Sequence, residues 1–150
     1  FSLKIPQEKP EISAFERHEK EPELIFCEDE KLDERIAADI KAALDEGFGT
    51  AAVICPTKRQ TRELYERLSK KIPVTLLEKS GEVKNGALIM PAYLSKGLEF
   101  DCVFVPYLDD DNYGGEFSNR LLYIACTRPL HRLKLYYSKE SGILKRLMGQ

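Results

Sequence analysis

Short apolar segments alternate with amphipathic segments along most of this chain, and this alternation constrains the fold more than any other feature. Strand-like segments are expected at residues 23–27, 51–55, 74–77, 87–90, 102–107 and 133–137, and helical ones at 33–46, 59–70, 118–127 and 143–148. Parallel strands need crossover connections, which helices usually supply. The alternation therefore predicts an α/β domain of three layers, a doubly wound and mainly parallel sheet flanked by helices.

Composition narrows the class of protein further. With 150 residues the chain is long enough for one domain with a core that needs neither disulfides nor metal. The net charge of -2 gives no global attraction to phosphates, so any contact with nucleic acid must be a local patch. No apolar run reaches the length of a membrane span and no signal-peptide pattern opens the chain, so we expect a cytoplasmic protein.

The cysteines and histidines give no sign of a metal site. The four cysteines never form a Cys-x-x-Cys pair, and there are only two histidines, far apart in the sequence. We expect the thiols to be reduced and structural, as is usual in a cytoplasmic protein, and no zinc site. The cysteines are Cys27, Cys55, Cys102 and Cys126.

The first residues differ in character from the rest. Residues 1–22 carry prolines and many Glu and Lys residues with little apolar periodicity, and the chain starts at Phe1 rather than Met. We expect residues 1–22 to be an extended connector from a missing upstream domain. Residues 23–150 are expected to form the folded domain.

The first candidate site is the stretch 90–100, which reads Met-Pro-Ala-Tyr-Leu-Ser-Lys-Gly-Leu-Glu-Phe. Gly97 permits a backbone shape or a close approach that a side chain would block. Ser95 and Lys96 can meet phosphate oxygens, and Glu99 is an acceptor suited to sugar hydroxyls. From the residues alone, a tight loop with Lys96 and Glu99 in a salt bridge is an equally good interpretation.

The second candidate site is the stretch 120–128, Arg-Leu-Leu-Tyr-Ile-Ala-Cys-Thr-Arg, an apolar helix that ends in Thr-Arg. Arg128 has planar, always-charged donors matched to phosphate and can point off the domain edge. The alternative is an arginine that complements the dipole at a helix C-terminus. Because doubly wound sheets place ligands at the carboxyl ends of strands, we expect both stretches at that edge or on the following helix.

In order and spacing, these two stretches resemble motifs V and VI of the UvrD/Rep-type superfamily 1 helicases, closest to the helicase IV-like branch. The resemblance implies that residues 23–150 are a RecA-like three-layer domain, the second of two motor domains. It implies that Glu99 contacts the ribose of ATP, with Gly97 and Lys96 beside it. It also implies that Arg128 is the catalytic arginine finger directed at the γ-phosphate.

The same resemblance implies a contact between this loop and single-stranded DNA. Tyr93 and Ser95 would then lie toward the strand. The sequence departs from the commoner pattern at Tyr93, which stands in place of His, and at Pro91, which stands in place of Thr. Pro129 stands in place of the usual Ala.

No Gly-x-x-x-x-Gly-Lys-Ser/Thr sequence occurs in the chain. Such a loop cradles the phosphates and helps to hold Mg²⁺. We therefore expect ATP and Mg²⁺ to be held mainly by a missing N-terminal P-loop domain of the same protein, and the isolated chain to be inactive. Asp109-Asp110-Asp111 after a strand imitates a Walker B segment, but a solvated turn is favoured over a weak metal site.

A further nucleic-acid contact is expected where the 51–55 strand ends. Thr57 and Lys58 open the next helix and are the preferred candidates for backbone contact. The same helix has a basic stripe that either tracks a phosphate backbone or is a solvated face. The stripe comprises Lys58, Arg59, Arg62, Arg67, Lys70 and Lys71.

Three functions remain open from the sequence. The first is the second motor domain of an ATP-dependent DNA helicase or translocase. The second is a nucleic-acid-independent protein-interaction module of a helicase-like factor, for example one that acts on RNA polymerase. The third is an unrelated doubly wound domain that binds a nucleotide or flavin by itself. Pro56-Thr57-Lys58 is not the Gly-rich turn that this third function requires.

Overall fold

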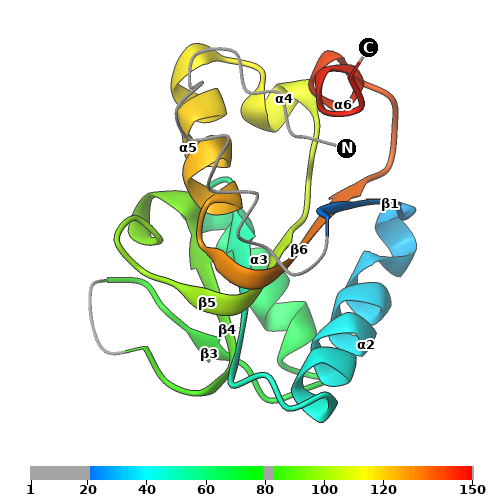
Figure 1. Cartoon of the computed structure of the whole chain (residues 1–150). Helices are drawn as coiled ribbons and strands as arrows, with labels where there is room; N and C mark the ends of the chain where they lie inside the picture. The colour runs from blue at the N-terminus through cyan, green and yellow to red at the C-terminus, as the bar shows by residue number, and fades with distance from the viewer. Residues whose placement is uncertain (1–20, 80–82, 150) are drawn as a thin grey trace.

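A six-stranded, all-parallel sheet forms the centre of the molecule (Figure 1). The computed structural model describes residues 21–79 and 83–149, so the predicted connector lies outside the described residues except for its last two. The strand order is β1-β6-β5-β2-β4-β3, and every pairing is parallel, as the sequence predicted. The strands are β1 (Glu23–Phe26), β2 (Thr50–Cys55), β3 (Thr75–Leu76), β4 (Gly86–Pro91), β5 (Phe100–Val105) and β6 (Pro129–Tyr137).

Helices cover both faces of the sheet and give the three layers expected of a RecA-like α/β domain (Figure 1). Two helices pack on one face, and three on the other. None of the helices in the described part of the chain is both long and apolar enough to cross a membrane. The helices are α2 (Leu32–Asp45) and α3 (Lys58–Leu68) on the first face, and α4 (Asp110–Tyr113), α5 (Glu116–Cys126) and α6 (Gly142–Leu147) on the second; η1 (Asp29–Lys31) and η2 (Ala92–Leu94) are short 3₁₀ helices.

The central strand β2 shows why the core has two halves. Successive side chains of a strand point to opposite faces, so Val53 packs toward α2 and α3 while Ile54 packs toward α4, α5 and α6. β2 is buried and apolar from Ala51 to Cys55, as expected of a strand covered on both faces of a parallel sheet. All four cysteines are buried and free. Burial raises the pKa of the Cys55 and Cys102 thiols to about 12, so both are protonated at neutral pH.

The acidic segment after β5 differs from the prediction. The solvated turn expected at Asp109–Asp111 is instead the start of a one-turn helix, α4. Asp109 caps this helix by accepting from the backbone N–H of Asn112 at 2.8 Å. Asp110 accepts from the backbone N–H groups of Gly142 and Ile143, at 2.8 and 2.9 Å, at the start of α6. These carboxylates therefore satisfy helix termini, and no group of three or more metal-ligating side chains occurs among the described residues.

The parallel strands create two distinct edges, which we name by the chain direction. At the amino edge the strands begin, with Thr50 of β2 level with Gly86 of β4. At the carboxyl edge they end, with Cys55 level with Pro91. Every connection in the sheet must run from the carboxyl edge back to the amino edge. This geometry decides where each candidate residue lies.

Candidate nucleotide and nucleic-acid site

The loop between β4 and β5 joins the two edges of the sheet. Tyr93 lies in η2, directly after the carboxyl end of β4, and its side chain is 49% exposed. Glu99 immediately precedes β5 at the amino edge and is exposed. The sequence predicts this stretch at the carboxyl edge or on the following helix, and this holds for Tyr93. Glu99 instead lies at the opposite edge, because the loop has to return across the sheet before β5 can begin.

A tight turn gives this loop its shape. Leu98 donates its backbone N–H to the Ser95 carbonyl at 3.0 Å. Gly97 has φ +84°, which the third position of such a turn requires. A Cβ at Gly97 would meet no atom within 4 Å, so the glycine is needed for backbone shape and not for a close approach. Lys96 and Glu99, both exposed, form no ion pair with each other, which removes the salt-bridged alternative.

Ser95 is fully buried within the same loop. Its hydroxyl donates to the Ala92 carbonyl at 2.7 Å. The hydroxyl therefore closes the one-turn helix η2 and does not face solvent. In this structure Ser95 shapes the loop that presents Tyr93, and a direct contact between Ser95 and a nucleic acid would require the loop to open.

Arg128 lies at the amino edge, where α5 ends and β6 begins. Its guanidinium donates to the Ile124 carbonyl (3.1 Å), the Leu98 carbonyl (3.1 Å) and the Thr127 hydroxyl (3.0 Å). The side chain is partly buried and held against the domain, so it does not simply point off the edge as the sequence suggested. The bond to Ile124 satisfies an end carbonyl of α5, and the bond to Leu98 joins the helix to the loop.

The structure thus brings the two candidate stretches together. The backbone N–H of Phe100 donates to the Arg128 carbonyl at 3.1 Å, next to the guanidinium bond to Leu98. Glu99 lies between Leu98 and Phe100 in the chain, so both of its neighbours are bonded to Arg128. The amino edge therefore presents one exposed carboxylate and one guanidinium on adjoining segments. Sequence spacing could not show this, because α5 starts at the carboxyl edge and carries Arg128 across the sheet.

Three of the four candidate residues for nucleic-acid contact lie at the carboxyl edge. Thr57 and Lys58 follow β2, Tyr93 follows β4, and the ends of these two neighbouring strands are level. All three side chains are exposed. Thr57 caps α3 by accepting from the backbone N–H of Gln60 at 3.2 Å, which leaves Lys58 on the first turn of the helix.

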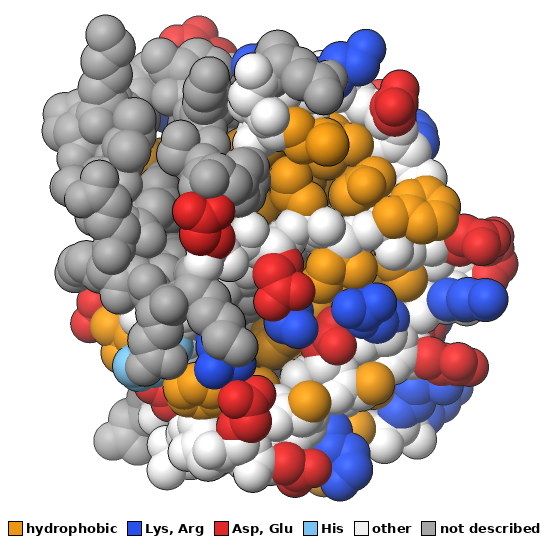
Figure 2. Space-filling model, turned by 45° about the vertical axis from the view of Figure 1, so that its right-hand side comes forward, with side chains coloured by type: hydrophobic (Ala, Val, Ile, Leu, Met, Phe, Trp, Pro, Cys, Tyr) orange, Lys and Arg blue, Asp and Glu red, His pale blue; other side chains and the backbone are white. Residues whose placement is uncertain are grey.

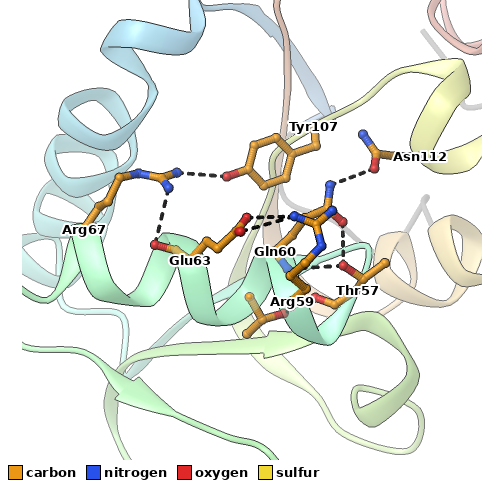
Figure 3. Close-up of polar contacts among 8 residues, drawn as sticks. Thr57, Arg59, Gln60, Glu63, Arg67, Tyr107 and Asn112 are labelled. Carbon is orange, nitrogen blue, oxygen red and sulfur yellow. Dashed lines mark hydrogen bonds and ion pairs between the residues drawn. The ribbon is translucent and has the colours of Figure 1, made fainter.

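Polar contacts from other parts of the chain, which the sequence did not reveal, hold both the start and the end of α3 (Figure 3). Thr57 donates its hydroxyl to Gln60 Oε1 at 2.7 Å, and Gln60 Nε2 donates to Asn112 Oδ1 at 2.8 Å. Arg67 donates to the Tyr107 hydroxyl at 3.1 Å. Tyr107 has φ +64°, which is unusual for an aromatic residue, and burial raises its pKa. The partners are 52 and 40 residues apart, so no local sequence signal could predict these contacts.

Half of the basic stripe along and after α3 is paired with acidic side chains. Its three arginines pair with Glu63, Glu78 and Asp33. On the face that carries α2, acidic and basic side chains are interspersed (Figure 2). A solvated helix face therefore describes the stripe better than a phosphate track does. The paired arginines are Arg59, Arg62 and Arg67.

Comparison with known proteins gives structural relatives but no family. No model of a protein family matches the chain, and no curated protein matches it. The chain is similar to the crystal structure of the C-terminal domain of a possible DNA helicase from Lactobacillus plantarum WCFS1, with a TM-score of 0.78 and 26% identity over 98% of this chain and 94% of that one. It also resembles the Arterivirus nonstructural protein 10 (helicase), solved in complex with DNA, with a TM-score of 0.53 and 13% identity over 83% of this chain and 30% of that one.

These likenesses define the class of domain. The second, at 13% identity, shows the fold alone. The first covers nearly the whole of both chains and supports a helicase C-terminal domain. The chain is thus a RecA-like α/β domain of the kind found at the C-terminus of helicases, and its activity is taken up next as a proposal.

Proposed function

We propose that this chain is the second motor domain of an ATP-dependent DNA helicase or translocase. The observation that carries the proposal is the hydrogen bond from Arg128 to Leu98, which joins the two motif-like stretches at one edge of a helicase-type fold. In this proposal an N-terminal P-loop domain of the same protein packs against the amino edge. Closure of the two domains around ATP then drives stepping along single-stranded DNA.

The amino edge suits one half of a nucleotide site. Glu99 offers an exposed acceptor to the ribose hydroxyls, while Lys96 and the open turn at Gly97 lie beside it. Arg128 offers a guanidinium whose charge would stabilise the γ-phosphate during its transfer. The described residues include no carboxylate cluster for Mg²⁺, so we assign Mg²⁺ and most phosphate contacts to the P-loop domain.

Arg128 has to exchange hydrogen bonds to act in this way. In this structure its hydrogen bonds include those to the Ile124 and Leu98 carbonyls and to the Thr127 hydroxyl. Approach of a phosphate would replace these neutral acceptors by charged ones, which form stronger hydrogen bonds to a guanidinium. The bond to Leu98 makes the position of the finger sensitive to the loop that carries Glu99.

At the carboxyl edge we propose the contact with single-stranded DNA. The exposed ring of Tyr93 can stack on a base, an interaction worth about 1–3 kcal/mol per base. Lys58 and Thr57 lie at the end of the neighbouring strand and can meet the phosphate backbone. One loop, 92–99, then connects the DNA contact at one edge to the ribose contact at the other.

The finer assignment rests on the two stretches in the sequence. Their order and spacing favour superfamily 1 and the UvrD/Rep-type, helicase IV-like branch. A second candidate function, a protein-interaction module acting for example on RNA polymerase, makes no use of Arg128 or of DNA. The two proposals therefore differ in what a change at Arg128 should do.

The test is ATP hydrolysis by the full-length protein with and without single-stranded DNA. We expect DNA to stimulate turnover, and Arg128→Ala to lower kcat by about 10³-fold while ATP still binds. Arg35→Ala is the matched control, because Arg35 is an exposed arginine on α2, outside both candidate stretches, and donates to Asp39 at 3.0 Å. This control should keep near-normal turnover.

Turnover that ignores both DNA and the Arg128→Ala change would overturn the motor proposal. Binding to a partner protein would then become the leading function. Salt-sensitive binding to single strands by the same protein would support the DNA contact, since phosphate contacts release counterions.

A further inference from the structure

Asp101, the second residue of β5, holds the start of that strand against β2. Its Oδ2 atom accepts from the backbone N–H of Gly49 at 2.7 Å and of Thr50 at 3.1 Å. In return, the backbone N–H of Asp101 donates to the Thr50 hydroxyl at 2.8 Å. A Cβ at Gly49 would lie 3.3 Å from Asp101 Oδ2, so the loop before β2 is packed closely on the carboxylate.

The other side of β5 has a matching irregularity. Phe100 pairs with Pro129, but Cys102 pairs with Arg132, so β6 has one more residue than β5 over this interval. The register shift lies opposite Asp101, at Leu130 and His131, and His131 Nε2 is 3.8 Å from Asp101 Oδ1. Bulges are frequent next to active sites, where they redirect side chains.

These contacts surround the two residues of the proposed nucleotide site. Glu99 lies two residues before Asp101, and Phe100 between them is bonded to the Arg128 carbonyl at 3.1 Å. Asp101 extends the pairing of β5 with the central strand β2 to the start of β5, next to Glu99, through its bonds to Gly49 and Thr50.

We propose that Asp101 is a positioning residue, which fixes Glu99 and Arg128 relative to each other at the amino edge. This inference rests on the proposed function of that edge. It predicts that replacing Asp101 impairs ATP hydrolysis and the preference for ATP more than an equal loss of stability elsewhere in the domain would. The effect comes from the three hydrogen bonds that join Asp101 to Gly49 and Thr50, which we call the Asp101 bracket.

The chain offers a matched control for the test. Asp110 also accepts two backbone N–H groups, at 2.8 and 2.9 Å, but it does so at the carboxyl edge, opposite the edge where Glu99 and Arg128 lie. Asp101→Asn and Asp110→Asn therefore remove the same kind of charged acceptor. Hydrogen bonds to charged groups are the stronger kind, so both changes should lower stability in a similar way.

The experiment compares ATP with 2′,3′-dideoxy-ATP as substrates of the full-length protein in the presence of single-stranded DNA. In the unchanged protein, kcat/KM should be higher for ATP because Glu99 accepts from the ribose hydroxyls. Glu99→Gln should reduce this preference. Asp101→Asn should reduce it as well and lower kcat by about tenfold, the effect of one charge-assisted hydrogen bond. Asp110→Asn should leave both the preference and kcat unchanged.

The outcomes separate the two proposals. If the unchanged protein shows no DNA-stimulated turnover, or if Arg128→Ala has no effect, the proposed function fails. If those results hold but Asp101→Asn behaves as Asp110→Asn does, the positioning role of Asp101 is wrong. Should Asp101→Asn fail to fold, Thr50→Val removes one bond of the bracket at nearly constant volume. It should produce the same loss of preference in weaker form, and an unchanged preference would overturn the inference.

Discussion

At the scale of the residue, Gly97 determines the shape of the loop that joins the two edges. Its φ of +84° lies in the region that favours glycine, and the space around its missing side chain is open. Any penalty for a side chain there is therefore conformational and not steric. From the sequence alone, Gly97 could serve either a backbone shape or a close approach, and the structure supports the backbone shape.

Gly97→Ala should destabilise the domain by about 1–2 kcal/mol, because an L side chain disfavours this backbone conformation. Gly97→Asn should cost less, since Asn tolerates positive φ better than Ala does. Chemical denaturation of the chain measures both variants. Equal stability of Gly97→Ala and the unchanged chain would show that the turn does not require positive φ.

At the scale of the element, short helices depend on carboxylates that come from elsewhere in the chain. α6 has only six residues and is capped both by its own Ser141 and by Asp110, which lies 32 residues before Gly142. The hydrogen bonds from Gly142 and Ile143 lower the pKa of Asp110. A group whose pKa is lower in the folded state contributes stability above its unfolded pKa and loses it as the pH falls through the folded pKa.

Asp110→Asn should therefore lower the free energy of unfolding at neutral pH by about 1 kcal/mol or less, the usual effect of losing a helix cap that an exposed side chain supplies. The difference in the free energy of unfolding between the variant and the unchanged chain should disappear as the pH falls below about 4, the ordinary range of an aspartate pKa. Denaturant unfolding at several pH values checks this.

Asp111→Asn is the control for that series. Asp111 is exposed and lies 3.5 Å from Lys139, an arrangement that contributes little to stability. Its substitution should leave the unfolding free energy nearly unchanged. If the difference in the free energy of unfolding between Asp110→Asn and the unchanged chain stays constant at acidic pH, the capping role of Asp110 is wrong.

At the scale of the whole molecule, we expect the domain to supply half of a nucleotide site. The loop that cradles phosphates has no counterpart in the sequence, and Glu99 and Arg128 lie together at one edge of the sheet. We expect the isolated chain to hydrolyse essentially no ATP, with or without single-stranded DNA, in a phosphate-release assay. DNA-stimulated turnover by the purified chain would contradict the view that a second domain supplies the phosphate contacts.

The helices and strands were predictable because local patterns encode them. Ile36 and Ile40 lie four residues apart and are buried on α2, and Leu64 and Leu68 are buried in the same way on α3. The apolar run at 102–107 forms most of β5, although the strand begins two residues earlier. The strand predicted at 74–77 shrinks to Thr75–Leu76, because it is an edge strand paired on one side only.

The sequence by itself determined the alternation of elements, the parallel sheet and the identity of the two candidate stretches, since these depend on residue types and spacing over short distances. Only the tertiary structure decided that Glu99 and Arg128 lie at the same edge on segments joined by hydrogen bonds, that Ser95 is buried, and that Asp101 accepts from Gly49 and Thr50. Each of these depends on a loop or helix crossing the sheet, or on contacts between segments roughly 30 to 50 residues apart. Such distances leave no periodic signal in the sequence, because closure of the sheet and not local preference brings the residues together.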